Sequence, residues 1–452
     1  MKIIIVGCGK IGTTIIANLV SEGHDVVGID SDPAVISNLT DLYDVMCVCG
    51  NGVDCDVLAE ADVDKCELFV SVTGSDEFNM LSCYLAGKMG AKNTIARIRN
   101  PEYNDKSLGF MRNELELSDS INPEQLCARE IYNILKFPGA VGIETFSARK
   151  FELLEIRLKP DSPFDGTSLA ELRRKFQAKF LVCAVERDGV AIIPDGSFVL
   201  RGGDRIGITA TPSELSKLLR ETGLLQKKTR SVMILGASTT AFYLAKRLID
   251  AGISVKVIEI SRERCEEFSR KLPSVTVICG DGASAELLME EGIDSADAFV
   301  SMTGLAEQNI LISCLAASRN VPSVITKINR SELISMAEKM GLESIISTKK
   351  IVGDLITGYA RALQNSIGSS VETLYKLMDG SVEALEFSVQ SDFEYTNIPL
   401  KDMKLRKNIL IAGIIRGNTP IIPAGSDIIL PGDKVVVFAS GTRLSVLSDI
   451  MA

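Results

Sequence analysis

The chain has 452 residues, of which 46% are apolar and 24% are charged, and its mean hydropathy is +0.19. At about 150 residues per domain, this length predicts several domains with substantial hydrophobic cores and excludes an intrinsically disordered chain. The net charge of −10 and the pI near 5.0 disfavour sequence-independent binding to nucleic acid, which requires a basic surface.

No apolar run approaches the ~18 to 20 residues that a membrane-spanning helix requires. The apolar start from Ile3 to Val6 is interrupted by Lys10, so we expect a buried strand rather than a signal peptide. The 11 cysteines contain no C-x-x-C pair, and the single histidine, His24, lies in a loop that we expect to be solvated. These features predict free thiols in a reducing cytosol and no metal site.

Short β-rich runs alternate with longer amphipathic segments in the first part of the chain. The predicted strands are Lys2–Val6, Asp25–Ile29, Val45–Cys49, Leu68–Val72 and Thr94–Arg97. The predicted helices are Ile11–Glu22, Ala34–Leu42, Cys55–Ala61 and Glu77–Met89, and a further helix begins at Asn122-Pro123 and ends near Pro138-Gly139. This alternation predicts an α/β fold, a doubly wound parallel sheet of the Rossmann type with helices on both faces.

The rest of the first half has a different pattern. Strands are expected at Phe151–Leu158 and Leu181–Glu186, a helix at Ser168–Phe176, and a hairpin around Asp195-Gly196. These elements predict a small α+β domain.

The second half of the chain repeats the first. The segment Val45 to Asn51 reads VMCVCGN and Val275 to Asp281 reads VTVICGD, and the seam of the duplication lies near Gln226 to Arg230. The repeat predicts two Rossmann-like lobes at residues 1–123 and 230–348, two small α+β lobes at 144–226 and 370–452, and connecting segments at 124–143 and 349–369.

The first predicted strand is followed by a G-x-G-x-x-G fingerprint, in the residues Gly7, Cys8, Gly9, Lys10, Ile11 and Gly12. Gly7 would permit the tight turn, Gly9 the approach of a pyrophosphate, and Gly12 the close packing of helix on sheet. Asp30 ends the next strand, where a carboxylate accepts hydrogen bonds from the adenosine ribose and favours NAD over NADP. The alternative is a glycine-rich turn that binds no ligand.

Other polar and glycine residues follow neighbouring strands, and we expect them around the same crevice, because ligands of open parallel sheets bind at the strands' carboxyl ends. They are Asn51, Gly52, Thr73, Gly74 and Arg97. Arg97 is a candidate phosphate clamp through its paired N–H donors, and an ion pair is its alternative role.

The aligned turn of the second half reads GASTTA from Gly236 to Ala241. Gly236 and Glu259 retain the turn and the ribose-directed acid, but Ser238 adds a side chain where the pyrophosphate would approach. Lys327 stands where the first half has Arg97. We therefore expect a weakened, altered or lost site in a lobe that is mainly a structural partner.

The sequence gives little support for catalysis. Tyr84 and Lys88 fit the Y-x-x-x-K pair of short-chain dehydrogenases, but they fall earlier in the chain than in that family. A nucleophile elbow at a strand-to-helix turn and a Walker A motif are both missing. No catalytic residue is predicted, and an NAD-dependent oxidoreductase is the alternative.

Four strings carry a resemblance to a known family: VTGSDEFNM at Val72–Met80, IARIRNPEY at Ile95–Tyr103, INPEQL at Ile121–Leu126 and YNILKFPGA at Tyr132–Ala140. With the glycine fingerprint and Asp30, they resemble the RCK (regulator of conductance of potassium) family. Over its whole length the chain is similar to the peripheral, NAD-binding regulatory subunits of Trk potassium-uptake systems, which carry tandem RCK domains.

The resemblance implies that NAD(H), and in some members ATP or ADP, binds the N-terminal lobe of an RCK unit. It implies a homo-oligomeric ring, by analogy a tetramer, beneath a membrane-embedded, TrkH-like potassium-translocating subunit whose gating it changes. The chain would then be a cytoplasmic protein, peripheral on the cytoplasmic face of the cell membrane, and not an enzyme. A sensor for another cation channel or exchanger is the second alternative.

The family's nucleotide contacts fall in this sequence on Gly7, Gly9, Lys10, Ile11, Asp30, Thr73 and Arg97. The segment Ile121–Pro138 resembles the family's crossover helix, which reaches over to a partner lobe. Gly236 and Glu259 fit a second site, whose occupancy the residues Ser238 and Ala241 call into question.

Overall fold

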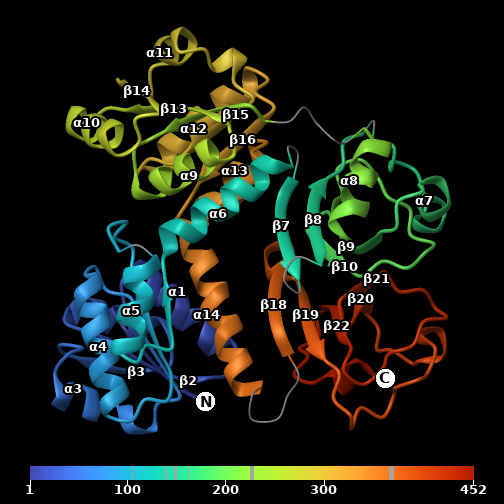
Figure 1. Cartoon of the computed structure of the whole chain (residues 1–452), viewed down its shortest axis with the longest axis horizontal. Coiled ribbons are helices and arrows are strands. Elements are labelled where there is room, and N and C mark those ends of the chain that lie inside the picture. The colour runs from blue at the N-terminus through green and yellow to red at the C-terminus, as the bar shows by residue number, and fades with distance from the viewer. Residues whose placement is uncertain (104, 138–139, 147–149, 161, 224–228, 366–370) are drawn as a thin grey trace. The chain divides into compact units, whose positions relative to one another are not determined.

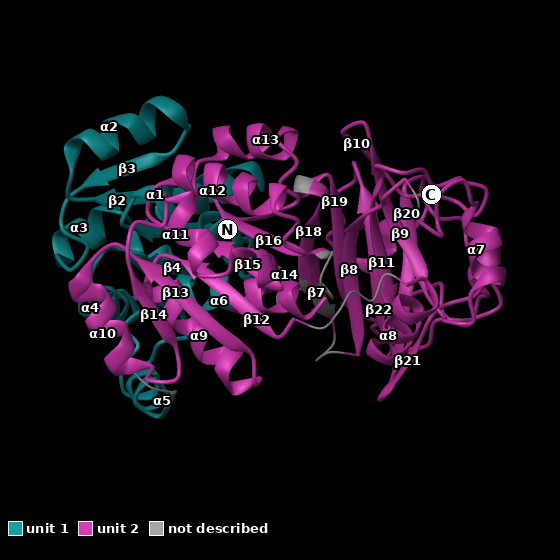
Figure 2. Ribbon diagram, turned by 90° about the horizontal axis from the view of Figure 1, so that it is seen from above, with its two compact units in different colours: residues 1–128, 347–360 teal, residues 129–346, 361–452 magenta. Residues whose placement is uncertain are grey.

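The computed structural model describes residues 1–452 except 104, 138–139, 147–149, 161, 224–228 and 366–370 (Figure 1). The expected helix end at Pro138-Gly139 and the part of the duplication seam at 226–228 lie outside the described residues. The chain divides into two compact units, residues 1–128 with 347–360 and residues 129–346 with 361–452 (Figure 2).

The first Rossmann-like lobe is built around a six-stranded parallel sheet with the order β3-β2-β1-β4-β5-β6. Its strands are β1 (Lys2–Val6), β2 (Asp25–Asp30), β3 (Met46–Cys49), β4 (Leu68–Ser71), β5 (Thr94–Arg97) and β6 (Asp119–Ile121). Its helices are α1 (Lys10–Ser21), α2 (Pro33–Leu42), α3 (Cys55–Glu60), η1 (Val63–Lys65), α4 (Asp76–Lys88) and α5 (Asp105–Glu114). The order reverses between β1 and β4, so the loops after these two strands flank the position where open parallel sheets bind ligands.

The centre of this sheet is apolar because helices cover it on both faces. Ile3, Ile4 and Ile5 of β1 are fully buried, as are Leu68 and Phe69 of β4. The strands and helices predicted for this lobe are confirmed to within a few residues. The sequence pattern does not predict α5 and β6, because the α5 segment is mostly polar and β6 is only three residues long.

The turn after α1 corrects the expectation for the single histidine. Gly23 has a φ of +76°, and the N–H groups of Gly23 and His24 donate to the carbonyl oxygens of Val20 and Leu19. This glycine-ended turn folds the chain back onto the helix. His24 is therefore buried, with 7% exposure, and the expectation of a solvated side chain is wrong.

The second Rossmann-like lobe repeats the sheet, in the order β14-β13-β12-β15-β16-β17. Its strands are β12 (Ser231–Leu235), β13 (Ser254–Glu259), β14 (Thr276–Cys279), β15 (Ala298–Ser301), β16 (Ser323–Lys327) and β17 (Ser344–Ile346). Its helices are α9 (Thr239–Asp250), α10 (Arg262–Lys271), α11 (Ala285–Glu290), η3 (Ile293–Ser295), α12 (Ala306–Ser318) and α13 (Ser331–Lys339). The duplication read from the sequence is therefore a duplication of the fold.

The two small lobes are five-stranded antiparallel sheets, in the orders β10-β9-β11-β8-β7 and β18-β19-β22-β20-β21. The first contains β7 (Ala140–Phe146), β8 (Phe151–Arg157), α7 (Leu169–Lys175), β9 (Leu181–Arg187), β10 (Val190–Ile192), β11 (Arg205–Ala210) and α8 (Pro212–Glu221). The second contains β18 (Val371–Leu377), η4 (Met378–Gly380), β19 (Val382–Ser388), η5 (Leu400–Asp402), β20 (Ile409–Arg416), β21 (Thr419–Ile421), β22 (Lys434–Ser440) and η6 (Leu447–Ile450). Within its described residues the second small lobe has 3₁₀ turns where the first has α7 and α8.

The hairpin of the first small lobe lies seven residues before its predicted position. Strands β9 and β10 are joined by Asp188 and Gly189, whose φ values of 53° and 77° suit a tight hairpin turn. The side chain of Asp195 instead accepts a hydrogen bond from the Ser197 N–H at 2.8 Å, as in a local Asx turn. The hairpin predicted at Asp195-Gly196 is therefore wrong.

The two small lobes share one hydrophobic core within the second unit. Phe146 and Phe151 of the first lobe pack with Phe438 of the second, and the rings of Phe146 and Tyr375 meet edge to face with centroids 4.8 Å apart. At the margin of this core, the Lys150 Nζ donates to the Asn418 Oδ1 at 2.6 Å. The small lobes are thus two copies joined by burial of a common apolar face.

Two further helices connect the lobes along the chain. Helix α6 (Pro123–Lys136) begins in the first unit and continues into the second. Helix α14 (Thr348–Asn365) follows the second Rossmann-like lobe, but most of it groups with the first unit. There Gly353 lies against α1, since a Cβ on it would be 2.8 Å from the Asn18 amide nitrogen and 3.3 Å from a Thr14 methyl. Among the described residues no helix has the length and apolar content required to cross a bilayer.

Candidate functional site

The glycine turn between β1 and α1 is shaped by two close approaches. Gly7 has a φ of +89°, and a Cβ on it would lie 2.9 Å from the backbone nitrogen of Thr73. A Cβ on Gly12 would overlap the Gly7 carbonyl oxygen. Both glycines are required by the chain's own packing, as the fingerprint predicts for the first and third positions.

Gly9 differs from these two glycines, because the chain itself does not require it. Its backbone is extended, and a Cβ built on it would meet no atom within 4 Å. It is the N-cap residue of α1, and within the described chain no side chain caps that helix end. The first N–H groups of α1 therefore lack a side-chain acceptor, and together with the positive end of the helix dipole they fit the diphosphate of a dinucleotide.

Asp30 is fixed at the edge of this turn. Its Oδ2 accepts a hydrogen bond from the Cys8 N–H at 2.7 Å, and its Oδ1 accepts one from the Asp32 N–H at 3.0 Å. Each oxygen keeps a further lone pair for a ligand hydroxyl. The Cys8 side chain points the other way, into the core, where burial and then the Asp30 charge raise the pKa of its thiol. The thiol stays protonated, so Cys8 contributes its backbone to the site and no nucleophile.

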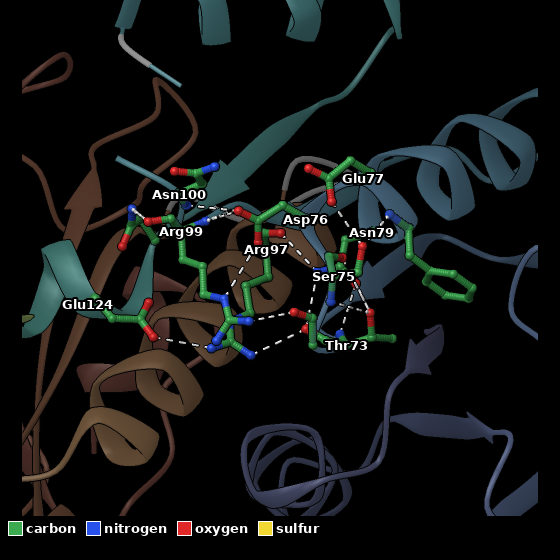
Figure 3. Close-up of polar contacts among 12 residues, drawn as sticks. Thr73, Ser75, Asp76, Glu77, Asn79, Arg97, Arg99, Asn100 and Glu124 are labelled. Carbon is green, nitrogen blue, oxygen red and sulfur yellow. Dashed lines mark hydrogen bonds and ion pairs between the residues drawn. The ribbon is translucent and has the colours of Figure 1, made fainter. Parts of the chain in front are cut away.

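A buried asparagine organises the loop after β4, and the sequence analysis missed it. The Asn79 Oδ1 accepts hydrogen bonds from the Thr73 N–H at 2.8 Å, from the Thr73 hydroxyl at 2.7 Å and from the Ser71 hydroxyl at 2.9 Å. Its Nδ2 donates to the carbonyl oxygens of Thr73 and Arg97 (Figure 3). Asn79 therefore ties the ends of β4 and β5 together. The available signal is its recurrence as Asn309, because AFVSMTGLAEQN at Ala298–Asn309 repeats LFVSVTGSDEFN at Leu68–Asn79.

Arg97 extends from the end of β5 between two partners (Figure 3). One terminal nitrogen donates to the Thr73 carbonyl at 3.3 Å, and the other to the Glu124 Oε1 at 3.2 Å. The two side chains are 12% and 18% exposed, and no hydrogen-bond partner is found within the described chain for the Arg97 Nε or the Glu124 Oε2. The ion pair that is the alternative role of Arg97 is thus present, and the guanidinium keeps one buried donor that has no partner within the described chain.

The other predicted site residues near the glycine turn, Gly52, Asn51 and Gly74, have different surroundings. A Cβ on Gly52 would overlap a Val6 methyl, so packing accounts for this glycine, and its carbonyl oxygen accepts from the Ser82 hydroxyl at 2.7 Å. Asn51 is exposed and accepts the Val53 N–H within its own turn at 3.2 Å. Gly74, like Gly9, has no atom near its Cβ position.

The second Rossmann-like lobe has the same skeleton with a different helix start. Gly236 has a φ of +99°, and the Glu259 Oε2 accepts the Ala237 N–H at 2.8 Å, as Asp30 accepts that of Cys8. The Ser238 hydroxyl, however, caps α9 by accepting the Ala241 N–H at 3.3 Å. The helix end that is open in the first lobe is occupied here by the chain's own oxygen.

The dehydrogenase-like pair does not form a proton-transfer unit. The Lys88 Nζ lies 2.6 Å from the Glu116 carboxylate and 5.5 Å from the Tyr84 ring centroid. The raised pKa of Lys88 reflects mainly its hydrogen bond to Glu116. Over the described part of the chain, no group of three or more His, Cys, Asp or Glu residues is placed to hold a metal ion.

Two family models match the chain in alternation. The TrkA-N domain matches residues 3–110 and 232–348, and the TrkA-C domain matches residues 153–223 and 384–452. The chain belongs to the TrkA family. Its expected resemblance to the regulatory subunits of Trk systems is therefore confirmed.

Curated TrkA relatives match this chain from end to end. The Trk system potassium uptake protein TrkA homolog of Archaeoglobus fulgidus is 33% identical over 450 residues, which is 100% of both chains. The Trk system potassium uptake protein TrkA of Vibrio alginolyticus is 31% identical and covers 100% of this chain and 98% of its own.

Solved RCK structures share the fold. The GsuK RCK domain matches with a TM-score of 0.65 at 16% identity, covering 97% of this chain and 92% of its own. The GsuK channel bound to NAD matches with a TM-score of 0.64 at 16% identity, covering 97% and 77%. At this identity the match shows the fold alone, and it confirms the predicted tandem of Rossmann-like and small α+β lobes.

Proposed function

We propose that this TrkA-family chain is the nucleotide-binding regulatory subunit of a Trk-type potassium-uptake system. The observation that carries the proposal is the open N-terminus of α1 at Gly9, beside the carboxylate of Asp30. The names of the TrkA relatives support the physiological role, and the NAD-bound GsuK channel, which shares the fold, supports the ligand class.

The ligand in this proposal is NAD(H), with ATP and ADP competing for the same turn. The diphosphate lies over Gly7, Gly9 and the first N–H groups of α1, and the ribose hydroxyls donate to Asp30. Other contacts come from the turn and the surrounding loops, at Cys8, Lys10, Ile11, Gly12, Asn51, Gly52, Thr73, Gly74 and Arg97. The second lobe, with Gly236 and Glu259, stays empty because Ser238 caps its helix.

Regulation in this proposal needs binding and no turnover. A ligand shifts a conformational equilibrium by its difference in affinity between the two states, and a tenfold difference is worth about 1.4 kcal/mol at each bound site. Several chains in a homo-oligomeric ring, a tetramer by analogy, add these contributions. The ring would act on a TrkH-like potassium-translocating subunit from the cytoplasmic face of the membrane. The domain boundaries predicted from the repeat remain part of this proposal.

Calorimetry with the full-length chain and NADH tests the proposal. We expect one NADH per chain and no loss of absorbance at 340 nm with a panel of carbonyl substrates. Gly9→Ser, which gives α1 the cap that α9 has, is expected to weaken NADH binding about tenfold or more, because the hydroxyl takes the N–H groups that hold phosphate.

The matched control is Ser238→Thr, which keeps a capping hydroxyl in the second lobe and should leave both the affinity and the stoichiometry of NADH binding unchanged. Two NADH per chain would contradict the assignment of the second lobe, and steady substrate-dependent oxidation would overturn the regulatory role. Co-purification of the chain with a membrane potassium translocator would test the partner, and we expect any effect of NADH on this association in the wild type to be reduced in Gly9→Ser.

A further inference from the structure

Glu124 holds the residue that we assign to phosphate. It lies in the first turn of α6, and its carboxylate accepts a hydrogen bond from the Arg97 guanidinium at 3.2 Å (Figure 3). Both side chains are mostly buried, at 12% and 18% exposure, so the pair is less screened by water than a surface ion pair.

Arg97 is also close to the glycine turn. It donates to the Thr73 carbonyl at 3.3 Å, and Thr73 packs against Gly7, where a Cβ would come within 2.9 Å of the Thr73 nitrogen. One loop residue therefore separates the guanidinium from the turn where the diphosphate would lie. The Arg97 Nε is buried and has no hydrogen-bond partner within the described chain, so a rearrangement that brought a phosphate oxygen to it would satisfy this donor.

A phosphate at this position and the Glu124 carboxylate would compete for one cation. A guanidinium has a fixed fork of donors, and two anions on the same fork repel each other in a poorly hydrated place. Nucleotide binding then weakens the pairing of Arg97 with Glu124, and the pairing weakens nucleotide binding by the same factor.

We infer that the Arg97–Glu124 pair is a latch that anchors the first turn of α6 in the absence of nucleotide and opens when a nucleotide phosphate takes Arg97. The inference rests on the proposed function. Helix α6 leads from the first compact unit into the second, so the latch lies at the start of a connection between them. Once released, Glu124 stays at the positive end of its own helix, which stabilises the open state.

The second lobe lacks the latch. Lys327 ends β16 where Arg97 ends β5, and Lys349 follows the first residue of α14 as Glu124 follows the first residue of α6. Two cations at these positions cannot form an ion pair. The latch residues are therefore present in the first lobe, where no side chain caps α1 within the described chain, and absent from the second lobe, where Ser238 caps α9.

Glu124→Gln in the full-length chain tests the inference, with NADH affinity measured by calorimetry. Removing the competing charge is expected to tighten NADH binding about five- to tenfold. In an Arg97→Gln background, the same Glu124 substitution should change affinity by less than about twofold, because the shared cation is gone. Lys349→Gln, at the matching position of α14, is the control and should leave affinity unchanged.

Hydrogen exchange gives an independent readout. In the wild type, NADH is expected to speed amide exchange in the first turns of α6, whereas in Glu124→Gln exchange there should be fast already and insensitive to NADH. Unchanged or weaker binding in Glu124→Gln overturns the latch, as does a tightening that persists without Arg97. If the wild type binds NADH normally while Glu124→Gln gives one of these contrary results, only the latch is overturned. If the wild type binds neither NADH nor ATP, both the latch and the proposed function are overturned.

Discussion

The two Rossmann-like lobes share their sheet order, glycine turn and buried asparagine, but they differ at the start of the helix after the turn and at the positions of Arg97 and Lys327. In both lobes the acid at the end of the second strand accepts a backbone N–H from the turn, at 2.7 Å for Asp30 and 2.8 Å for Glu259. That acid is therefore part of the fold, and its presence in the second lobe is not evidence for a ligand. The deciding feature is the N-cap residue, Gly9 in one lobe and Ser238 in the other.

The largest effect expected from this comparison is that of Gly9→Asp. Aspartate is a good N-cap residue, and a Cβ at this position meets no described atom within 4 Å, so the lobe should fold and its melting temperature should fall by no more than about 2 °C. The carboxylate would occupy the phosphate position and repel it. We expect NADH binding to weaken about a hundredfold or more, measured by calorimetry.

Ser238→Asp is the control for this change, because it exchanges one cap for another in the second lobe. It should leave NADH affinity and melting temperature close to those of the wild type. If Gly9→Asp bound NADH normally, the diphosphate would have to lie away from the α1 N-terminus.

Alanine at the two acids gives a smaller and more selective effect. Asp30→Ala and Glu259→Ala each leave a turn N–H without its acceptor, so each should lower the free energy of unfolding by about 1 to 2 kcal/mol in urea titrations. Only Asp30→Ala should also weaken NADH binding, by about tenfold, because only that carboxylate is expected to meet a ribose. Equal losses of affinity in the two variants would show that the second lobe binds nucleotide.

The smallest effect on nucleotide binding is expected from a difference between the two connecting helices, which changes stability alone. On α6, desolvation raises the pKa of Glu130 to about 7 from 4.5, although the Arg129 charge and a backbone hydrogen bond at Ile143 oppose the rise. The corresponding residue of α14 is Leu355. A carboxyl whose pKa is higher in the folded state binds more protons there than in the unfolded state. The contribution of Glu130 to the free energy of unfolding is therefore fully present below about pH 4.5 and is lost as the pH rises through about 7.

Urea unfolding between pH 5 and 8 checks this dependence. The contribution of Glu130 to the free energy of unfolding should fall by roughly 2 to 3 kcal/mol over this window, and Glu130→Gln should flatten the curve. An unchanged slope in the variant would show that Glu130 is ionised in the folded chain.

The sequence predicts the elements of the first lobe well because burial patterns and glycine signals are local. The wrong hairpin shows the limit of local signals. Asp188-Gly189 and Asp195-Gly196 are the same dipeptide, and only the pairing of β9 with β10 decides which one turns the chain. Local patterns also fail to predict the burial of His24, because it results from a turn that is held by backbone hydrogen bonds to the end of α1.

The sequence predicts the glycine turn and the position of Asp30 beside it, but it does not predict the contacts that hold the surrounding loops in place. The bonds of Asn79 to Thr73 and Arg97, and that of Arg97 to Glu124, join residues that are distant in sequence. Which residues form these hydrogen bonds depends on the order of the strands in the sheet, and no local sequence pattern specifies that order. Internal repetition is the signal that could have identified Asn79, because it recurs as Asn309 beside the same threonine and serine.

The core shared by the two small lobes, with Phe146, Phe151 and Phe438 at its centre, has a consequence for how the copies diverged. In a homodimer of a single-copy chain, every mutation would appear in both subunits at once. Covalent fusion fixes the proportion of the two copies at one to one in every molecule. Under the proposed function, fusion would let one copy lose its ligand while every molecule still contained a copy that binds it.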